Sequence, residues 1–158
     1  MKKTIQGIVL FVFLISITGC GKSGSTTSSG TSKTDLLTKQ DWVVTVMQHK
    51  AVNGSVWTDD YGSFKPCQKD DRVVFKTNNT YEGNEGPTKC NPNDPQIKAT
   101  GTWTFAENET ILVVKDAIGT QIFYATIQTL STSSLSLSFT IVDQTSGVTY
   151  QFLETYSH

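Results

Sequence analysis

Few residues in this chain of 158 residues are able to do chemistry, since it contains three cysteines and two histidines. The histidines are His49 and the terminal His158, so a zinc site with four convergent nitrogen or sulfur ligands lacks partners. The absence of a C-x-x-C pair argues against a redox motif. A Ser-His-Asp or Cys-His arrangement would have to use His49, which we expect to be exposed beside Lys50 at a strand end. We therefore predict no metal, no cofactor and no catalytic centre.

Paired carboxylates occur twice, at Asp59-Asp60 and Asp70-Asp71. Neither pair has the alternating ligand spacing of a calcium loop. Neighbouring residues of a strand point to opposite faces, so the carboxylates of Asp70-Asp71 would not converge as acid and base. We interpret both pairs as solvated loop charges or as caps on turn amides.

The start of the chain resembles a secretion signal. Lys2-Lys3 is followed by an apolar run over residues 8–17, which is shorter than the roughly 20 residues of a membrane-spanning helix. Ile17-Thr18-Gly19-Cys20 resembles the lipobox, the cleavage motif of bacterial lipoprotein precursors. This resemblance implies that residues 1–19 are a signal peptide and that Cys20 becomes an acylated membrane anchor, carrying diacylglycerol and palmitate-like chains. The alternative is an ordinary signal peptide with a chance cysteine.

Residues 20–34 comprise Cys20 and a tract rich in Gly, Ser and Thr. This composition buries little apolar area, so we expect a flexible tether with a root-mean-square span of roughly 20 Å. Loss of Lys2 and Lys3 from the 13 basic residues would leave 11 against 14 acidic residues, a net charge of −3, which disfavours nucleic acid as a partner. No acidic run follows Cys20, which favours an outer-membrane location facing the periplasm, with surface display as the alternative.

Cys67 and Cys90 remain once Cys20 is assigned to lipid. An even pair in the oxidising compartment beyond the inner membrane is typical of a disulfide. In the chain-entropy model, closing this loop contributes about 3.5 kcal/mol to stability. We predict a structural disulfide between the two residues.

Alternation of apolar and polar residues dominates residues 35–158, which are enough for one domain with its own core. In the first expected strand, Trp42, Val44 and Val46 share one face, and Asn78-Asn79 later suits a tight hairpin. We predict an all-β fold: eight antiparallel strands in up-and-down order, closed into a barrel after a short N-terminal helical turn. The strands are expected around residues 42–46, 73–75, 80–81, 101–105, 111–114, 121–129, 135–141 and 148–155.

Two long stretches, residues 51–70 and 84–96, break this alternation and contain all four prolines. The expected disulfide joins them, so we interpret the pair as a stapled flap at one end of the barrel. Trp57 and Tyr61 lie in the first stretch. They have three interpretations: a gate at the barrel mouth, a contact patch, or a small extension of the core over the open end.

From about Leu36 to Tyr156 the chain resembles the lipocalin-like domain of bacterial cell-envelope lipoproteins. The resemblance rests on Leu37 through Trp42, Cys67-Gln68-Lys69-Asp70-Asp71, Val74-Phe75, Asn79-Thr80-Tyr81, Cys90, Gly101-Thr102-Trp103 and Asn108-Glu109-Thr110-Ile111. Two positions depart from the family pattern, since Gln40 and Asn79 stand where glycine is usual. The resemblance implies a calycin-type barrel of eight strands, a shape rather than an activity.

The interior of an eight-stranded barrel is either filled by side chains or able to hold one small ligand. Large and small residues alternate at expected inward positions, which predicts a cavity open toward the flap. Candidate ligand-binding residues are Trp103, Phe105 and Phe139 in the barrel and Trp57 and Tyr61 in the flap. The leading hypothesis is a membrane-tethered module of the cell envelope, not an enzyme, that binds a small apolar or amphipathic ligand. The alternative is a filled barrel that binds an envelope protein through its loops, as an inhibitor or accessory subunit.

Overall fold

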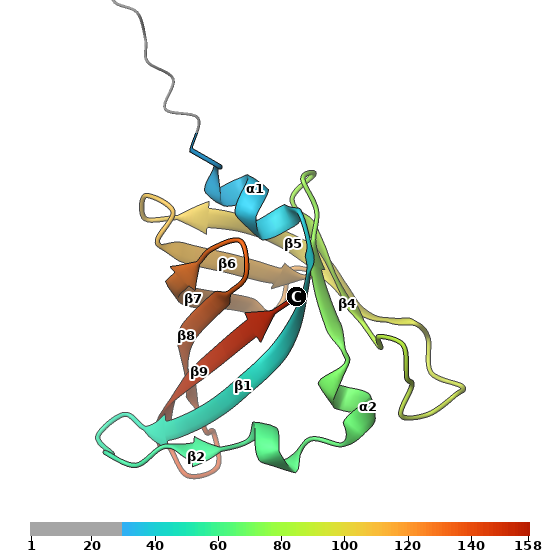
Figure 1. The fold of residues 1–158 in the computed structure, drawn as a ribbon. Helices are drawn as coiled ribbons and strands as arrows, with labels where there is room; N and C mark the ends of the chain where they lie inside the picture. The colour runs from blue at the N-terminus through green and yellow to red at the C-terminus, as the bar shows by residue number, and fades with distance from the viewer. Residues whose placement is uncertain (1–29) are drawn as a thin grey trace, which may run out of the picture.

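Eight antiparallel strands close into a barrel in the computed structural model, which describes residues 30–158 (Figure 1). Each strand pairs with the next along the chain, and pairing between the first and last strands closes the barrel. A short extra strand, β2 (Thr58–Asp59), adds to β1 at Gln48 and His49. The prediction of an up-and-down barrel is confirmed. Its strands are β1 (Asp41–Ala51), β3 (Arg72–Phe75), β4 (Thr80–Asn84), β5 (Ile97–Ala106), β6 (Ile111–Asp116), β7 (Ile122–Leu130), β8 (Leu135–Val142) and β9 (Thr149–Ser157).

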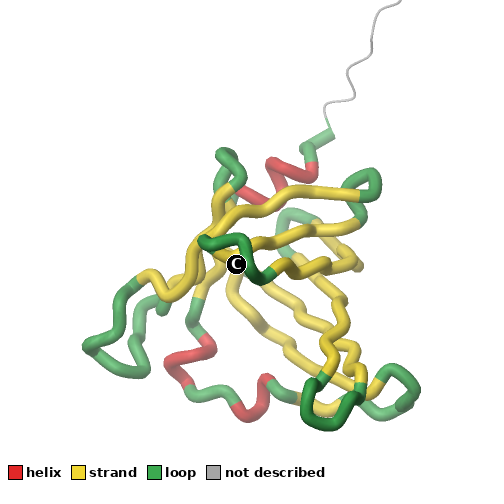
Figure 2. The backbone as a smooth tube through the Cα atoms, turned by 180° about the vertical axis from the view of Figure 1, so that it is seen from behind, coloured by secondary structure: helices red, strands yellow, loops and turns green. Residues whose placement is uncertain are grey.

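The two ends of the barrel differ. Helix α1 (Lys33–Thr38) lies at one end with the tight turns 76–79, 107–110 and 131–134, and we call this the closed end. The opposite end carries both long connections, and we call it the loop end. There the link from β1 to β3 contains β2, the 3-10 helix η1 (Tyr61–Ser63) and helix α2 (Pro66–Lys69). Figure 2 shows the helices at opposite ends of the strands.

Apolar side chains from α1 and the strands fill the closed end. Leu37 and Trp42 are fully buried, and the Trp42 indole N–H donates to the Leu37 carbonyl at 2.9 Å. Ser32 caps α1 by accepting from the Asp35 amide at 3.0 Å. Helix α1 therefore covers the closed end, and the hydrogen bond from Trp42 to Leu37 together with the shared core fixes its position. The core continues from there into the barrel with Phe75, Trp103, Leu112, Ala125, Leu135 and Leu137.

Irregular positions in the strands decide which residues face inward. A bulge in β1 between Val44 and Val46 shifts its pairing with β9, so Met47 lines the interior and Val46 is 37% exposed. The predicted shared face of Trp42, Val44 and Val46 is wrong at Val46 for this reason. The predicted Asn78-Asn79 hairpin is confirmed, with Asn79 in the left-handed region at φ 65°. Asparagine replaces the usual glycine there because it tolerates this conformation.

The barrel and its core form a complete unit within residues 30–158. Each of the eight barrel strands has a neighbour on both sides, and the core cluster draws its members from α1 and those strands. A chain beginning at Gly30 therefore keeps every strand pair and the whole of this core. We refer to this segment as the barrel chain.

Candidate functional site

Two adjoining cavities lie inside the barrel, each with a volume of about 240 Å³. We call the first the apolar chamber because its wall is mostly apolar side chains of β3, β6, β7 and β8. The second lies toward the loop end and carries charged side chains, and we call it the entrance chamber. Val73, Glu154 and Tyr156 line both. The apolar chamber is lined further by Phe75, Leu112, Val114, Ala125, Leu137 and Phe139, and the entrance chamber by Val44, Met47, Phe64, Asp71, Arg72 and Lys98.

Charges around the entrance chamber are paired in small groups. Arg72 lies 3.3 Å from the Asp41 carboxylate. Lys98 Nζ donates to Asp71 at 2.5 Å and lies 3.4 Å from Glu85, whose side chain is only 5% exposed. Burial alone would lower the pKa of Lys98, but the hydrogen bonds and charges of Asp71 and Glu85 together raise it above its ordinary value. Both cations of the entrance are therefore already opposed by carboxylates.

Glu154 on β9 is a carboxylate inside the barrel wall. Its cross-strand neighbours are apolar, Met47 of β1 and Leu137 of β8. The Tyr156 hydroxyl donates to Glu154 Oε2, and within residues 30–158 no lysine, arginine or histidine lies within ion-pair distance of this carboxylate. Burial raises the pKa of Glu154, while the Tyr156 hydrogen bond lowers it by less. Burial also raises the pKa of Tyr156, with the neighbouring Glu154 charge as a second cause.

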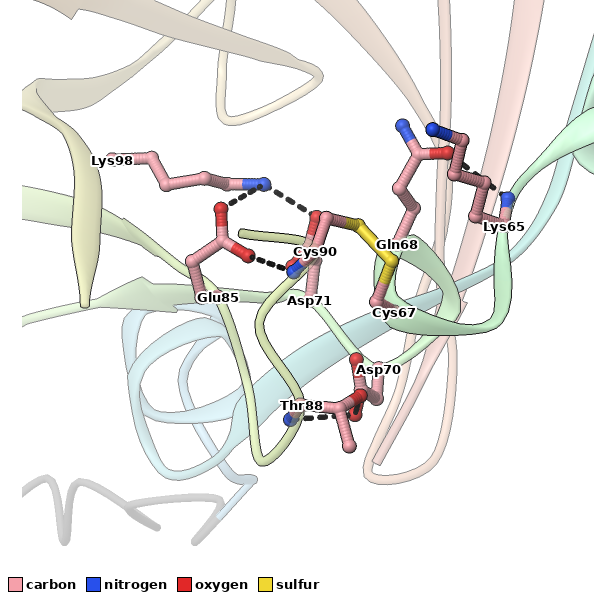
Figure 3. The surroundings of a disulfide bond; sticks show 9 residues. All are labelled: Lys65, Cys67, Gln68, Asp70, Asp71, Glu85, Thr88, Cys90 and Lys98. Atoms are coloured by element: carbon pink, nitrogen blue, oxygen red, sulfur yellow. Dashed lines mark hydrogen bonds and ion pairs between the residues drawn. A yellow bond between two sulfur atoms is a disulfide. The ribbon is translucent and has the colours of Figure 1, made fainter. Parts of the chain in front are cut away.

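A disulfide holds the two long connections at the loop end together (Figure 3). It joins Cys67 of α2 to Cys90 in the link between β4 and β5, as predicted. Asp70 reinforces the junction by accepting from the Thr88 amide at 3.0 Å. Gly86 adopts φ 67°, and a Cβ there would lie 2.0 Å from the Asp70 carbonyl oxygen, so only glycine allows this approach. The contacts narrow the flap predicted over residues 51–70 and 84–96 to residues 61–71 with 85–96, and the name refers to these residues from here on.

The comparison with known families matches the sequence of this barrel. The model of the lipocalin-like domain covers residues 39–137, more than half of the chain. The chain belongs to the lipocalin-like domain family. The matched segment runs from the start of β1 into β8 and includes the flap and most of the apolar chamber. The comparison with curated proteins gave no match.

Of the three aromatic residues predicted to bind a ligand inside the barrel, one lines a chamber and two do not. Phe139 lines the apolar chamber and stacks on Phe152 with ring centroids 5.4 Å apart. Trp103 is buried in the core and donates its indole N–H to the Lys76 carbonyl at 3.0 Å. Phe105 packs edge-on against Trp103 at 5.3 Å. Neither Trp103 nor Phe105 lines a chamber, because both point into the filled part of the barrel.

The predicted loop aromatics also lie outside the chamber walls. Trp57 is 36% exposed and lies under the Lys50 ammonium, 5.1 Å from the ring centroid. Tyr61 holds the Lys69 ammonium at 4.5 Å and packs on Phe64. Phe64, from the same segment, is the loop aromatic that lines the entrance chamber. The loop thus supplies an aromatic wall residue, but a different one from those predicted.

Polar residues of the loop end follow the sequence interpretation in part. Asp59 caps the Gly62 amide at 3.2 Å and Asp70 caps Thr88, as predicted for turn carboxylates. Asp60 instead pairs with His49 at 2.7 Å, and Asp71 pairs with Lys98. His49, expected to be an exposed strand end, is half-buried against Phe152 and Tyr150 because the bulge in β1 turns it inward.

Glu154 and Tyr156 were missed by sequence reasoning, although the sequence carries a signal for them. On β9, every second residue from Tyr150 is Tyr150, Phe152, Glu154 and Tyr156, so the acidic residue falls on an otherwise aromatic face. An acidic residue at an inward position is rare unless it is paired.

Cys20 and the signal peptide lie outside the described residues. Within residues 30–158, no helix is long and apolar enough to cross a membrane, and no three His, Cys, Asp or Glu side chains converge on a metal position.

Proposed function

We propose that this lipocalin-like barrel binds one small apolar or amphipathic ligand and is held at a membrane of the cell envelope through lipid on Cys20. The single observation that carries the binding proposal is the pair of chambers inside the barrel. Each measures about 240 Å³. An apolar cavity of about 150 Å³ already binds benzene in another protein, whereas drug-sized ligands occupy roughly 300–1,000 Å³. A ligand that fits one chamber is therefore larger than benzene and smaller than most drugs.

The chambers also favour binding over the alternative of a filled barrel that acts through its loops. A filled interior packs at a density of about 0.74 and leaves few voids larger than a water molecule. Here the part of the barrel around Leu37, Trp42 and Trp103 is packed in this way, while the apolar chamber opens beyond this core and the entrance chamber follows toward the loop end. The charged entrance and the apolar wall behind it fit an amphipathic molecule with its apolar part innermost.

Binding is tested on the barrel chain with N-phenyl-1-naphthylamine, a neutral probe that fluoresces in apolar surroundings. We expect saturable binding that is weakened at least roughly tenfold by Ala125→Leu, because Ala125 is 5% exposed and lines the apolar chamber. Ala117→Leu, in the exposed turn between β6 and β7, is the matched control and leaves binding unchanged. Absence of probe binding, or equal loss in both variants, would favour the filled interaction protein.

The anchor is supported by the lipobox at residues 17–20 and tested on the full chain. Bacteria that make the protein are grown with an alkyne fatty acid, and incorporation of the label is followed on gels. We expect label on the wild-type chain and none on Cys20→Ser, which should accumulate as the unprocessed precursor. Normal processing and membrane retention of Cys20→Ser would refute the anchor without affecting the proposed binding.

A further inference from the structure

The chemistry of the ligand follows from Glu154, the acidic residue in the shared wall of the two chambers. This carboxylate lies where the apolar chamber meets the entrance chamber, with Met47 and Leu137 as its cross-strand neighbours. The Tyr156 hydroxyl donates one hydrogen bond to it. An ionised carboxylate accepts about four hydrogen bonds. Glu154 therefore faces the chambers with most of its accepting capacity unused by the described residues.

The cations nearest the entrance are engaged elsewhere. Lys98 is held by Asp71 and Glu85, and Arg72 is paired with Asp41. The two cations are thus balanced against three carboxylates, and Glu154 adds a fourth. The electrostatic field at the entrance is negative on balance, which favours a positively charged ligand and disfavours an anionic one.

We propose that Glu154 selects a small apolar ligand bearing a protonated amine, with the ammonium group at the junction of the chambers and the apolar body in the apolar chamber. This inference rests on the proposed binding function and names the ligand class. An ammonium has three donors and matches the free acceptor positions of the carboxylate. The pair forms in a poorly solvated wall, where a charge-assisted hydrogen bond is stronger than at the surface. The bound cation also reverses the effect of burial that raises the pKa of Glu154.

Arg72 offers the competing possibility of an anionic ligand. Its buried Nε–H has no partner among the described residues and could bind a ligand carboxylate. The Arg72 side chain as a whole is 41% exposed and paired with Asp41, so water and Asp41 screen its charge. A fatty acid placed between Arg72 and Glu154 would also bring two carboxylates together in the wall. We therefore expect the amine to bind more tightly than the acid.

Three ligands of equal chain length separate these possibilities: octylamine, 1-octanol and octanoate. Each is titrated calorimetrically at pH 7 into the barrel chain and into Glu154→Gln, Arg72→Gln and Glu107→Gln. Glu107 is an exposed turn residue, so its variant is matched in charge to Glu154→Gln. In the wild type we expect octylamine to bind at least roughly tenfold more tightly than the other two, which is the size of one charge-assisted hydrogen bond. Glu154→Gln should remove this preference, while Arg72→Gln and Glu107→Gln keep it.

The outcomes distinguish the inference from the proposed function. Equal or tighter binding of octanol or octanoate in the wild type overturns the amine preference while leaving a ligand-binding barrel. Octanoate binding that is lost in Arg72→Gln assigns the selective role to Arg72 and overturns the role of Glu154. An amine preference that survives Glu154→Gln but falls in Glu107→Gln reports surface attraction and also overturns it. If none of the ligands binds and N-phenyl-1-naphthylamine does not bind either, the proposed function itself fails. The wild-type comparison stands even if Glu154→Gln does not fold.

Discussion

The charge on Glu154 is held where the barrel solvates it poorly. Burial raises the pKa of this carboxyl above its ordinary value of 4.5, and the Tyr156 hydrogen bond offsets part of that rise. The other ionisable groups lining the entrance beside it are Tyr156 of β9, Asp71 just before β3, Arg72 of β3 and Lys98 of β5. Because the folded state holds the proton more tightly than the unfolded chain, stability falls as the pH rises from about 4.5 through the folded-state pKa. Below this window the penalty is absent.

Replacing Glu154 by glutamine removes the ionisable group and keeps its shape. We expect Glu154→Gln to have a higher Tm than the wild type at pH 8, and the difference to vanish near pH 4, where the glutamic acid is protonated. Differential scanning fluorimetry of the barrel chain across this pH range measures it. Glu107→Gln, at an exposed turn, should show no such dependence. A Tm difference that stays constant with pH would mean that Glu154 acts through packing rather than through its charge.

Single residues of the site were predictable where their strand is regular. Phe139 lies in the uninterrupted alternation of β8, and its inward position follows from period two. Trp103 and Phe105 were correctly expected to point inward, but alternation gives the face of a residue and not its height along the barrel. Their height places them in the filled closed end. Met47 and His49 could not be predicted because the bulge in β1 reverses the alternation.

At the scale of elements, the flap depends on a covalent link and a few polar contacts rather than on a core. Replacing Cys67 and Cys90 together by serine should lower the free energy of unfolding by a few kcal/mol, at most about 3.5 kcal/mol by loop entropy. We expect hydrogen exchange to speed up in residues 61–71 and 85–96 and to change little in β6, β7 and β8. The flap would then be held only loosely, by the hydrogen bond from Thr88 to Asp70 and by the ion pair of Lys98. Equal acceleration in the barrel strands would show that the disulfide stabilises the whole fold uniformly.

Helix α1 closes the other end through one buried side chain. Leu37 is fully buried against the core, so Leu37→Ala should cost about 2–5 kcal/mol in urea unfolding. The Trp42 indole, which donates to the Leu37 carbonyl, would then lose packing contacts in this part of the core. Binding of N-phenyl-1-naphthylamine should change less than twofold, because Leu37 lines neither chamber. If Leu37→Ala weakens the probe as much as Ala125→Leu does, the two ends of the barrel are coupled.

For the whole molecule, the sequence predicted the strand order, the closure and the stapled loops, since these follow from alternation, turn residues and two cysteines. It did not predict the short elements β2, η1 and α2 within residues 51–70. These elements are too short for a periodic signal, and contacts with β1 and the disulfide determine them. The chemistry of the interior therefore remained open from the sequence, because it depends on how these loop elements are placed.

Strand pairing in the barrel is incomplete along one side of β1. Strand β3 pairs with β1 only over Asp41–Val43, and β2 joins β1 at Gln48, so no strand of the described structure pairs with residues 44–47 on this side. The Asp60 amide donates to the Met47 carbonyl there at 2.9 Å. Val44 and Met47 of this stretch line the entrance chamber, and Phe64 lines the same chamber from the loop. We expect a small ligand to pass most easily here, where the strand ladder is interrupted.

Phe64 is therefore expected to control the rate of ligand passage. Removing its ring by Phe64→Ala should raise both the association and the dissociation rate constants of N-phenyl-1-naphthylamine several-fold, with a smaller change in Kd, because the ring obstructs entry and exit alike. Stopped-flow fluorescence on the barrel chain measures both constants. Trp57→Leu is the matched control, since Trp57 lies in the same connection but outside the chamber wall. Unchanged rates in Phe64→Ala, with faster rates in Trp57→Leu, would place the gate at Trp57 and the entry path beyond β2.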